Sequence, residues 1–264
     1  MEVSHADDWV QCDERRLAAL KEIDKEEKRL RDTLNEIFLP EKDDVVRSGT
    51  NTDWLKDAAD SVDVEFISHR PDRLVTRHTN DMTEKLLNLL KGAQSDVNII
   101  SPYLVPTENL MEAFRELRVK GIPIRIITNS LKSTDNLFAQ AAYRFRKNEL
   151  IRMGIEIYEY NGPNTVHAKT AIIDGQVGLI GTYNLDPRSA FINREIGFIM
   201  KDSNNNELIK QLESTIEKFR SNSFLVGRDG VEHNKDKEFE GVSSGKKKLL
   251  HGVTLLLPLI YNQI

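Results

Sequence analysis

The chain has 264 residues and a mass of 30.2 kDa, so it is long enough for one large or two small domains with a sizeable core. Its net charge of −5 excludes a global attraction to nucleic acid or anionic lipid, and any basic binding surface must be local. The single cysteine, Cys12, excludes an intrachain disulfide and fits a reducing compartment. The sequence contains no signal-peptide pattern and no apolar run of the ~18 residues that a membrane span needs. We therefore expect a cytoplasmic protein, either soluble or peripheral on the inner face of the cell membrane.

Residues 1–50 are expected to form an N-terminal region of their own. Leucine and isoleucine recur at helical spacing between Asp13 and Phe38, and Pro40 follows them. This pattern predicts a charged amphipathic helix, which either lies solvated across a core or docks on a partner as a coiled coil. The polar stretch that follows, to Asn51, predicts a connector.

Strands and helices alternate through a predicted domain that spans residues 51–225. The apolar and β-branched runs predict strands at 62–67, 97–101, 123–128, 155–160 and 195–200. The helical patterns with their capping residues predict helices at 79–90, 107–120, 134–153 and 206–220. This alternation predicts an α/β layer fold, with helices on both faces of one mixed sheet.

A β-hairpin is predicted between residues 168 and 182, with its turn at Asp174-Gly175-Gln176. Side chains alternate along a strand, so His167 and Lys169 share a face, as do Thr182 and Asn184. A turn at Gly175-Gln176 sets His167 opposite Asn184 and Lys169 opposite Thr182. A turn at Asp174-Gly175 slides the pairing by two residues and leaves the same four side chains on one face. An imidazole, an ammonium, a hydroxyl and an amide together predict a phosphate site that contains a nucleophile.

These residues carry a resemblance to a known family. The pattern HxKxxxxD followed by GTxN, RS and NxE resembles the HKD motif of the phospholipase D superfamily; its positions are His167, Lys169, Asp174, Gly181, Thr182, Asn184, Arg188, Ser189, Asn193 and Glu195. Thr182 stands where the family more often has serine, which keeps the hydroxyl. Stretches 101–103, 128–135 and 154–160 resemble the second half of bacterial cardiolipin-synthase-type proteins. The resemblance implies a phospholipase D-like α/β/α layer fold.

The resemblance also implies roles for the motif residues. His167 would attack the phosphorus of a phosphodiester and form a phosphohistidine, because neutral imidazole is a good nucleophile near neutral pH. Lys169 and Asn184 would hold the non-bridging oxygens as charge develops. Glu195 would accept a hydrogen bond from the imidazole and fix its tautomer. Asp174 would either support the hairpin structurally or tune the site.

Further residues are expected to bind the substrate. Gly181 would allow close packing beside the phosphate, and Thr182 would hydrogen-bond the phosphate or the catalytic lysine. Asn129 and Ser130 follow a predicted strand and would line the head-group side of the site. The alternative for this Ser/Thr/Asn-rich loop is that it simply caps the helix that starts near Asp135. We expect no metal and no cofactor, because no metal-ligand spacing or glycine-rich phosphate loop occurs in the sequence.

The predicted C-terminal tail covers residues 226–264. In it, Lys246, Lys247 and Lys248 precede the apolar stretch LLHGVTLLLPLI, which resembles the closing segment of the family. This segment would seat on an anionic membrane surface or dock on the core as a helix with solvated lysines.

The chain contains one HxK motif, whereas the superfamily builds one active site from two. Either two copies pair as a homodimer so that each donates one motif, or the chain is the C-terminal half of a longer enzyme. Three functions remain open: a phospholipid phosphatidyltransferase or phospholipase D of the cardiolipin-synthase type, a homodimeric phosphodiesterase or nuclease, and a non-catalytic half-enzyme. The acidic charge counts against nucleic acid as a partner and leaves a phospholipid as the expected substrate.

Overall fold

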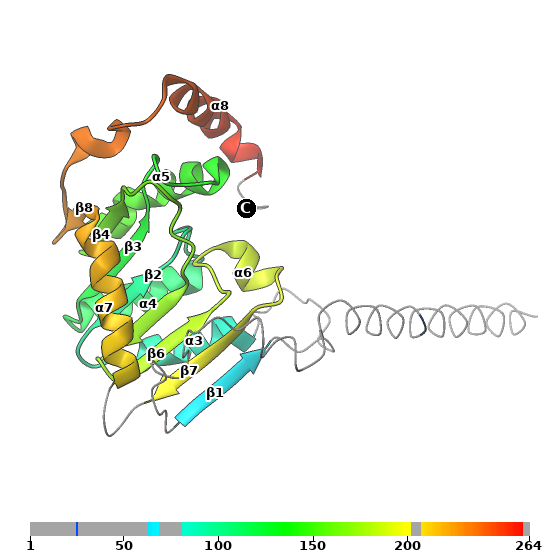
Figure 1. Cartoon of the computed structure of the whole chain (residues 1–264), viewed down its shortest axis with the longest axis vertical. Coiled ribbons are helices and arrows are strands. Elements are labelled where there is room, and N and C mark those ends of the chain that lie inside the picture. The colour runs from blue at the N-terminus through cyan, green and yellow to red at the C-terminus, as the bar shows by residue number, and fades with distance from the viewer. Residues whose placement is uncertain (1–24, 26–62, 69–80, 202–206, 261–264) are drawn as a thin grey trace, which may run out of the picture. The chain divides into compact units, whose positions relative to one another are not determined.

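The computed structural model describes residue 25 and residues 63–68, 81–201 and 207–260 (Figure 1). Contacts divide the chain into Met1–Ala58 and Ala59–Ile264, and the second unit contains every described residue except Lys25. Lys25 is helical and exposed, while the rest of the helix predicted at 13–38 and the predicted connector lie outside the described residues. The division of the chain near residue 50 stays a prediction.

Nine strands in the described ranges form one mixed sheet, in the order β1-β7-β6-β5-β2-β3-β4-β8-β9. The strands are β1 Asp63–Ser68, β2 Val97–Ile100, β3 Ile124–Asn129, β4 Glu156–Tyr160, β5 Thr170–Ile173, β6 Val177–Gly181, β7 Ile196–Lys201, β8 Ser223–Arg228 and β9 Val231–Glu232. β2, β3 and β4 are parallel, and the other neighbours pair antiparallel. The sequence prediction missed β8 and β9, so the boundary expected at 225 falls inside a strand. No glycine or proline separates β8 from the preceding helix, so the sequence lacks the usual signal of a boundary between the two elements.

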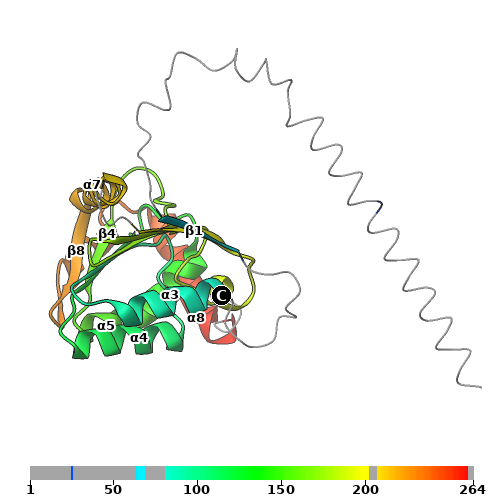
Figure 2. The ribbon, with the colours of Figure 1, turned by 90° about the horizontal axis from the view of Figure 1, so that it is seen from below.

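Helices cover both faces of this sheet, as predicted. They are α3 Asp81–Gly92, α4 Glu108–Val119, α5 Leu137–Arg152, α6 Pro187–Phe191, α7 Glu207–Ser221 and α8 Ser244–Ile260, with a 3₁₀ turn η1 at Lys235–Phe239. Figure 2 shows α3, α4 and α5 on one face and α7 on the other. No helix in the part of the chain that the structure describes is long and apolar enough to cross a bilayer.

The helix ends follow the capping chemistry of the sequence. Asn136 begins α5, and its Oδ1 accepts hydrogen bonds from the N–H groups of Phe138 and Ala139 at 3.0 Å each. Gly121 and Gly154 follow the ends of α4 and α5 with φ of 79° and 81°, which is the left-handed conformation that ends a helix.

Two apolar layers hold the sheet in place. Met82, Leu90 and Phe114 are fully buried between the sheet and the α3–α5 face. Ile172 and Ile209 belong to a smaller cluster under α7. Burying one such side chain stabilises a fold by about 1.5–3 kcal/mol, so both faces contribute to holding the sheet rigid.

The parallel strands define the edge at which the motif lies. β2, β3 and β4 end at the same edge of the sheet, and Ile100 at the end of β2 pairs with Thr170 at the start of β5. His167 and Lys169 immediately precede Thr170, so they lie at this carboxyl edge, where open α/β sheets place their ligands.

Candidate active site

The β5–β6 hairpin turns at Asp174-Gly175. Both residues have positive φ, 56° and 62°, and the N–H of Gln176 donates to the carbonyl of Ile173 at 3.1 Å. This is the geometry that an Asp-Gly turn favours. Three residues separate the paired positions Ile173 and Val177, so the register lies between the two that the sequence suggested.

The corrected register changes which residues face each other. The N–H of Gly181, rather than Thr182, lies opposite Lys169 and donates to its carbonyl at 3.1 Å. The expected side chains nevertheless meet, because β5 begins at Thr170 and β6 ends at Gly181. Strict alternation does not apply beyond those strand ends.

A hollow of about 640 Å³ gathers most of the predicted site residues. We call it the motif hollow; its lining consists of His167, Lys169, Gly181, Thr182, Asn184, Asn193, Arg194, Glu195 and Ile196. Six of these nine were predicted as site residues. Asp174, Asn129 and Ser130 do not line it.

His167 and Lys169 lie side by side at the base of this hollow. The Lys169 Nζ is 3.0 Å from Nδ1 and 3.2 Å from Nε2 of His167, and it donates to the His167 carbonyl at 2.7 Å. The imidazole is exposed, whereas Lys169 is 8% exposed. Burial lowers the pKa of Lys169, and the negative charges of Glu195, Asp135 and Asp186 act in the opposite direction. A single small region therefore contains an accessible nucleophile and a buried cation.

Glu195 forms a buried acidic wall of the hollow. Its Oε1 accepts from the Ser189 hydroxyl at 2.8 Å and from the Asn193 amide at 3.1 Å, and its Oε2 accepts from the Thr182 hydroxyl. Its hydrogen-bond partners in the described structure do not include His167, so the expected bond to the imidazole is not formed within this chain. Thr182 Oγ1 also accepts from the N–H of Ile196 at 3.0 Å. The threonine hydroxyl therefore links β6 to Glu195 instead of bonding Lys169.

Asn184 keeps unused hydrogen-bonding capacity at the hollow. Its N–H donates to Ser189 Oγ at 3.0 Å, but its side-chain Oδ1 is buried and has no partner among the described residues. A buried acceptor without a donor is costly, so this oxygen is available to accept a hydrogen bond from a water molecule or a ligand.

The sequence prediction missed Asp186, which shapes the loop between β6 and α6. It is buried, and its carboxylate accepts from the N–H of Ser189 at 2.7 Å, which caps the short helix α6. Burial raises the pKa of Asp186. The Asp-Pro-Arg-Ser sequence carries the signal, since an N-cap aspartate before a first-turn proline is a common helix start.

Asp174 lies at the other end of β5 and serves the fold. Its carboxylate accepts from the N–H groups of Gln94, Ser95 and Asp96, at 2.6–3.2 Å, and from the Ser95 hydroxyl at 3.0 Å. Burial raises the pKa of this carboxyl, but the backbone and hydroxyl donors outweigh burial and the pKa lies below its usual range. The geometry favours structural support over tuning of the site.

Asn129 and Ser130 also support the site from outside the hollow. The Asn129 amide donates to the carbonyl of Val166 and accepts from its N–H, each at 2.9 Å, and so fixes the residue before His167. Ser130 Oγ donates to Asn161 Oδ1 at 3.2 Å. Both side chains are buried and hydrogen-bonded to the loops around them, and neither lines the motif hollow.

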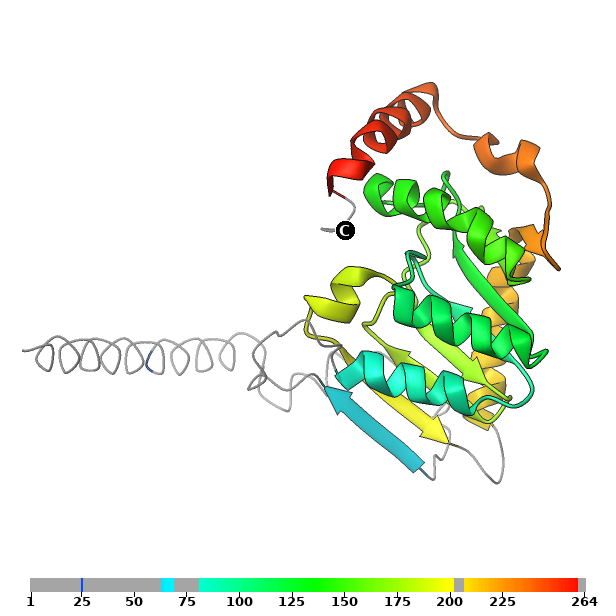
Figure 3. The same cartoon turned by 180° about the vertical axis from the view of Figure 1, so that it is seen from behind.

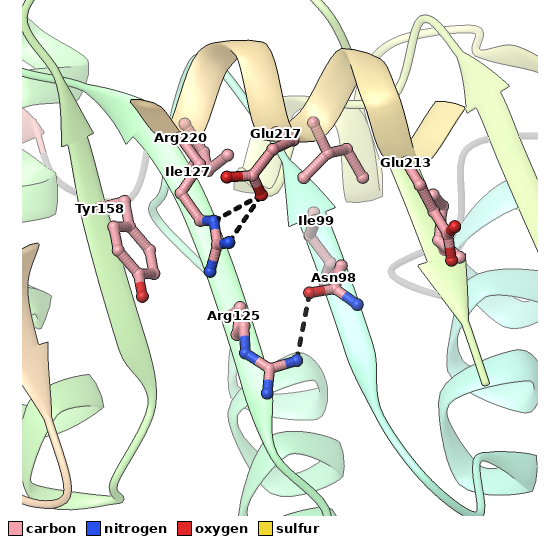
Figure 4. A pocket seen from close by; sticks show the side chains of 10 residues that line it. Asn98, Ile99, Arg125, Ile127, Tyr158, Glu213, Glu217 and Arg220 are labelled. Atoms are coloured by element: carbon pink, nitrogen blue, oxygen red, sulfur yellow. Dashed lines mark hydrogen bonds and ion pairs between the residues drawn. The ribbon is translucent and has the colours of Figure 1, made fainter. Parts of the chain in front are cut away.

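A separate hollow of about 300 Å³ lies between α7 and the sheet (Figure 4). Arg125 there bonds Asn98 at 3.4 Å and Asp96 at 3.2 Å, and Arg220 pairs with Glu217 at 2.6 Å. Both guanidinium groups are thus neutralised within the fold. Asn98 and Arg125 are near the amino ends of β2 and β3, on the opposite edge from the motif.

No group of three or more histidine, cysteine or carboxylate side chains that could hold a metal occurs in residues 63–68, 81–201 and 207–260. The expectation of a reaction without metal or cofactor stays a prediction.

Comparison with known proteins identifies the family. The sequence profile described as "Cardiolipin synthase, PLD-like domain" matches residues 86–220, a little over half of the chain. Cardiolipin synthase C of Escherichia coli K12 is 32% identical over an alignment of 145 residues that covers 48% of this chain and 31% of that protein. Cardiolipin synthase A of Buchnera aphidicola subsp. Baizongia pistaciae is 35% identical over 127 residues, 48% of this chain and 25% of that protein.

A solved structure shows the same fold. The crystal structure of phosphatidylserine synthase from Haemophilus influenzae Rd KW20 matches 76% of this chain and 46% of its own, with a TM-score of 0.55 and 17% identity. The expected phospholipase D-like fold is confirmed, while the matched stretch spans less than a third of the two cardiolipin synthases. The chain belongs to the cardiolipin synthase family of phospholipase D-like domains, in the phospholipase D superfamily.

Proposed function

We propose that this chain supplies one half of a phosphatidyl-transfer site of the cardiolipin-synthase type, with His167 as the nucleophile. The observation that carries the proposal is the grouping of His167, Lys169 and Asn184 around the motif hollow. The family and the named relatives support a phospholipid substrate such as phosphatidylglycerol.

In the first step, an imidazole nitrogen of His167 bonds to the phosphorus and the bond to the leaving alcohol breaks. A second imidazole protonates that alcohol. In the second step the same imidazole takes the proton of an acceptor hydroxyl, whose oxygen bonds to phosphorus and releases His167. Lys169 and Asn184 hold the non-bridging oxygens throughout, in a site where a buried cation is most effective.

Among the described residues, His167 is the one histidine that lines the motif hollow, so the proposal requires a second imidazole from a second copy of the chain or from another part of a longer protein. An apolar surface adjoins this hollow: Val64, Phe66, Ile180, Ile196 and Phe198 are 38–56% exposed on β1, β6 and β7. Phe66 and Phe198 pack at 5.2 Å, and Ile196 belongs to both this surface and the hollow. A second copy seated on this surface would bring a second His167 to the phosphate.

Contact with a membrane is part of the proposal. Lys247, Lys248, Leu249 and Leu255 of α8 are exposed, the two leucines by 59% and 69%. A helix that exposes lysines and leucines together binds anionic lipid by charge and apolar burial.

The test measures turnover of phosphatidylglycerol vesicles by the full chain, with release of the water-soluble head group as the readout. His167→Ala is expected to reduce turnover to background and to abolish an alkali-stable, acid-labile adduct on the protein. The matched control is His251→Ala, which removes an exposed histidine of α8 and keeps full activity. Turnover that survives His167→Ala would refute the proposal, and His167-dependent cleavage of DNA without lipid turnover would favour the nuclease alternative.

A further inference from the structure

His167 lies in a segment of the chain that has no regular secondary structure. Residues 161–169, between β4 and β5, are neither helix nor strand, so no ladder of hydrogen bonds sets the direction of the imidazole. After His167 the chain is fixed at Lys169, whose carbonyl accepts from the N–H of Gly181 at 3.1 Å. The position of the imidazole therefore depends on what holds the chain immediately before it.

Val166, the residue before His167, is held by the side-chain amide of Asn129. The Val166 N–H donates to Asn129 Oδ1, and Asn129 Nδ2 donates to the Val166 carbonyl, each at 2.9 Å. The amide thus satisfies both backbone polar groups of Val166, as a neighbouring strand would. Val166 is 2% exposed, so water does not readily take the place of the amide.

Asn129 is itself carried by a rigid part of the fold. It is the last residue of β3, where it pairs with Tyr160 of β4, and β3 lies inside the sheet between β2 and β4. Figure 3 shows the helices α3, α4 and α5 in front of this sheet. The side chain is 1% exposed, and its Nδ2 also donates to the carbonyl of Pro102 at 3.2 Å. The amide is therefore held from several sides, which is what a precisely placed site requires of its supporting residues.

The loop that follows Asn129 holds one further residue of the same segment. The hydroxyl of Thr165 donates to the Ser133 carbonyl at 2.6 Å, and the Ser133 hydroxyl lies 3.0 Å from Asn129 Oδ1. Residues 165 and 166 are thus both bonded to the stretch 129–133, at the carboxyl end of β3.

We propose that Asn129 is the positioning residue of the nucleophile. Through Val166 it holds the imidazole of His167 where it can attack a phosphorus that Lys169 and Asn184 bind, although Asn129 does not itself line the motif hollow. This inference rests on the proposed function. A misplacement of about 1 Å between reacting groups can cost about 100-fold in rate, so loss of this one amide is expected to slow the chemical step.

The first test measures the anchor without turnover, by amide hydrogen exchange of the full chain in peptides from residues 161–170. Asn129→Ala removes both partners of Val166 and should make its amide exchange at least tenfold faster. The matched control is Thr128→Val, which changes the neighbouring buried side chain; the Thr128 hydroxyl donates to the Pro102 carbonyl at 3.3 Å instead of bonding Val166. Exchange at Val166 should be unchanged in this control. Equal exchange in wild type and Asn129→Ala would overturn the inference.

The second test is the effect on kcat and KM for phosphatidylglycerol vesicles. Asn129→Ala is expected to lower kcat at least tenfold and to change KM less than twofold, because Lys169 and Asn184 still hold the phosphate. Thr128→Val should leave both constants within twofold of wild type. If Asn129→Ala does not fold, Asn129→Asp takes its place, since it keeps an acceptor for the Val166 N–H but, when ionised, has no donor for the Val166 carbonyl.

The outcomes separate this inference from the proposed function. Faster exchange at Val166 with an unchanged kcat, in a chain whose turnover depends on His167, refutes the positioning role alone. Turnover that survives His167→Ala refutes the proposed function and, with it, the catalytic role of Asn129. A loss of kcat in Asn129→Ala that is matched by Thr128→Val would also refute the positioning role, because it would show a general effect of altering the end of β3.

Discussion

Lys169 is the residue on which the electrostatics of the motif hollow converge. Its ammonium is removed from water, which lowers its pKa, and three carboxylates limit that fall. Because its Nζ contacts the imidazole directly, its protonation state sets the charge next to His167 and, in the proposed function, the strength of phosphate binding. The sequence shows the spacing of the two residues but not the burial of one and the exposure of the other.

The alkaline side of the pH–rate profile should report this lysine. Since burial lowers the pKa of Lys169, activity should fall at a pH below the 10.5 of an ordinary lysine. Asp135→Asn removes a charge that raises this pKa, so the alkaline limb should move to lower pH. Asp229→Asn should not move it, and added salt should shrink the shift. An alkaline limb that is identical in wild type and Asp135→Asn at low salt would contradict this assignment.

Residue roles were the least predictable part of the site. His167, Lys169, Asn184 and Glu195 were placed correctly at one hollow because their spacing is local to one hairpin and the next strand. Asn129 and Asp174 are equally polar, yet their side chains are hydrogen-bonded to backbone groups of Val166 and of residues 94–96, respectively. Those partners are far apart in sequence, so no local pattern reveals them.

At the scale of elements, β6 and β7 determine the width of the motif hollow. A Cβ built on Gly181 would lie 2.9 Å from the Gly197 Cα and still closer to the carbonyl of Ile196. Both contacts are to backbone, which cannot move aside without displacing Glu195 and the wall of the hollow.

Gly181→Ala should therefore reduce both stability and turnover. Overpacking of this kind typically costs about 1–3 kcal/mol, measured here as the free energy of unfolding in urea. Gly92→Ala is the matched control, since a Cβ there meets nothing within 4 Å. If Gly181→Ala were as stable and active as Gly92→Ala, the prediction would be contradicted, because β7 would then shift to accommodate the added Cβ without cost.

Regular elements with strong periodicity were predictable, and short ones were not. The helices α4 and α5 and the strands β2 to β4 lie within a few residues of their expected positions, because apolar spacing and glycine caps agree there. α6, with five residues, and β9, with two, have too few residues for a period. Their existence depends on tertiary contacts.

For the whole molecule, the decisive quantity is the number of chains that build one phosphate site. A shared site requires two copies of His167, so the solution mass by light scattering should be twice the 30.2 kDa of the chain. Wild type mixed and equilibrated with His167→Ala then gives a sharper result. Activity should follow the square of the wild-type fraction, leaving about a quarter in an equal mixture, whereas independent sites leave about half.

A linear dependence on the wild-type fraction would exclude a site shared between copies. A monomer without turnover would instead indicate that the second motif belongs to another part of a longer protein. The chain covers 31% of one cardiolipin synthase and 25% of another, which fits either arrangement.

The clamp at Asp174 has a consequence for the order of folding. The β5–β6 hairpin closes through a local turn. The carboxylate of Asp174 in that turn, however, accepts hydrogen bonds from residues 78–80 positions earlier in the chain, and β5 pairs with β2. Such long-range closures form after local hairpins and helices, because the entropy of a long loop must be overcome first. We therefore expect His167 to reach the carboxyl edge of the sheet only after β5 has paired with β2 and Asp174 has bonded residues 94–96.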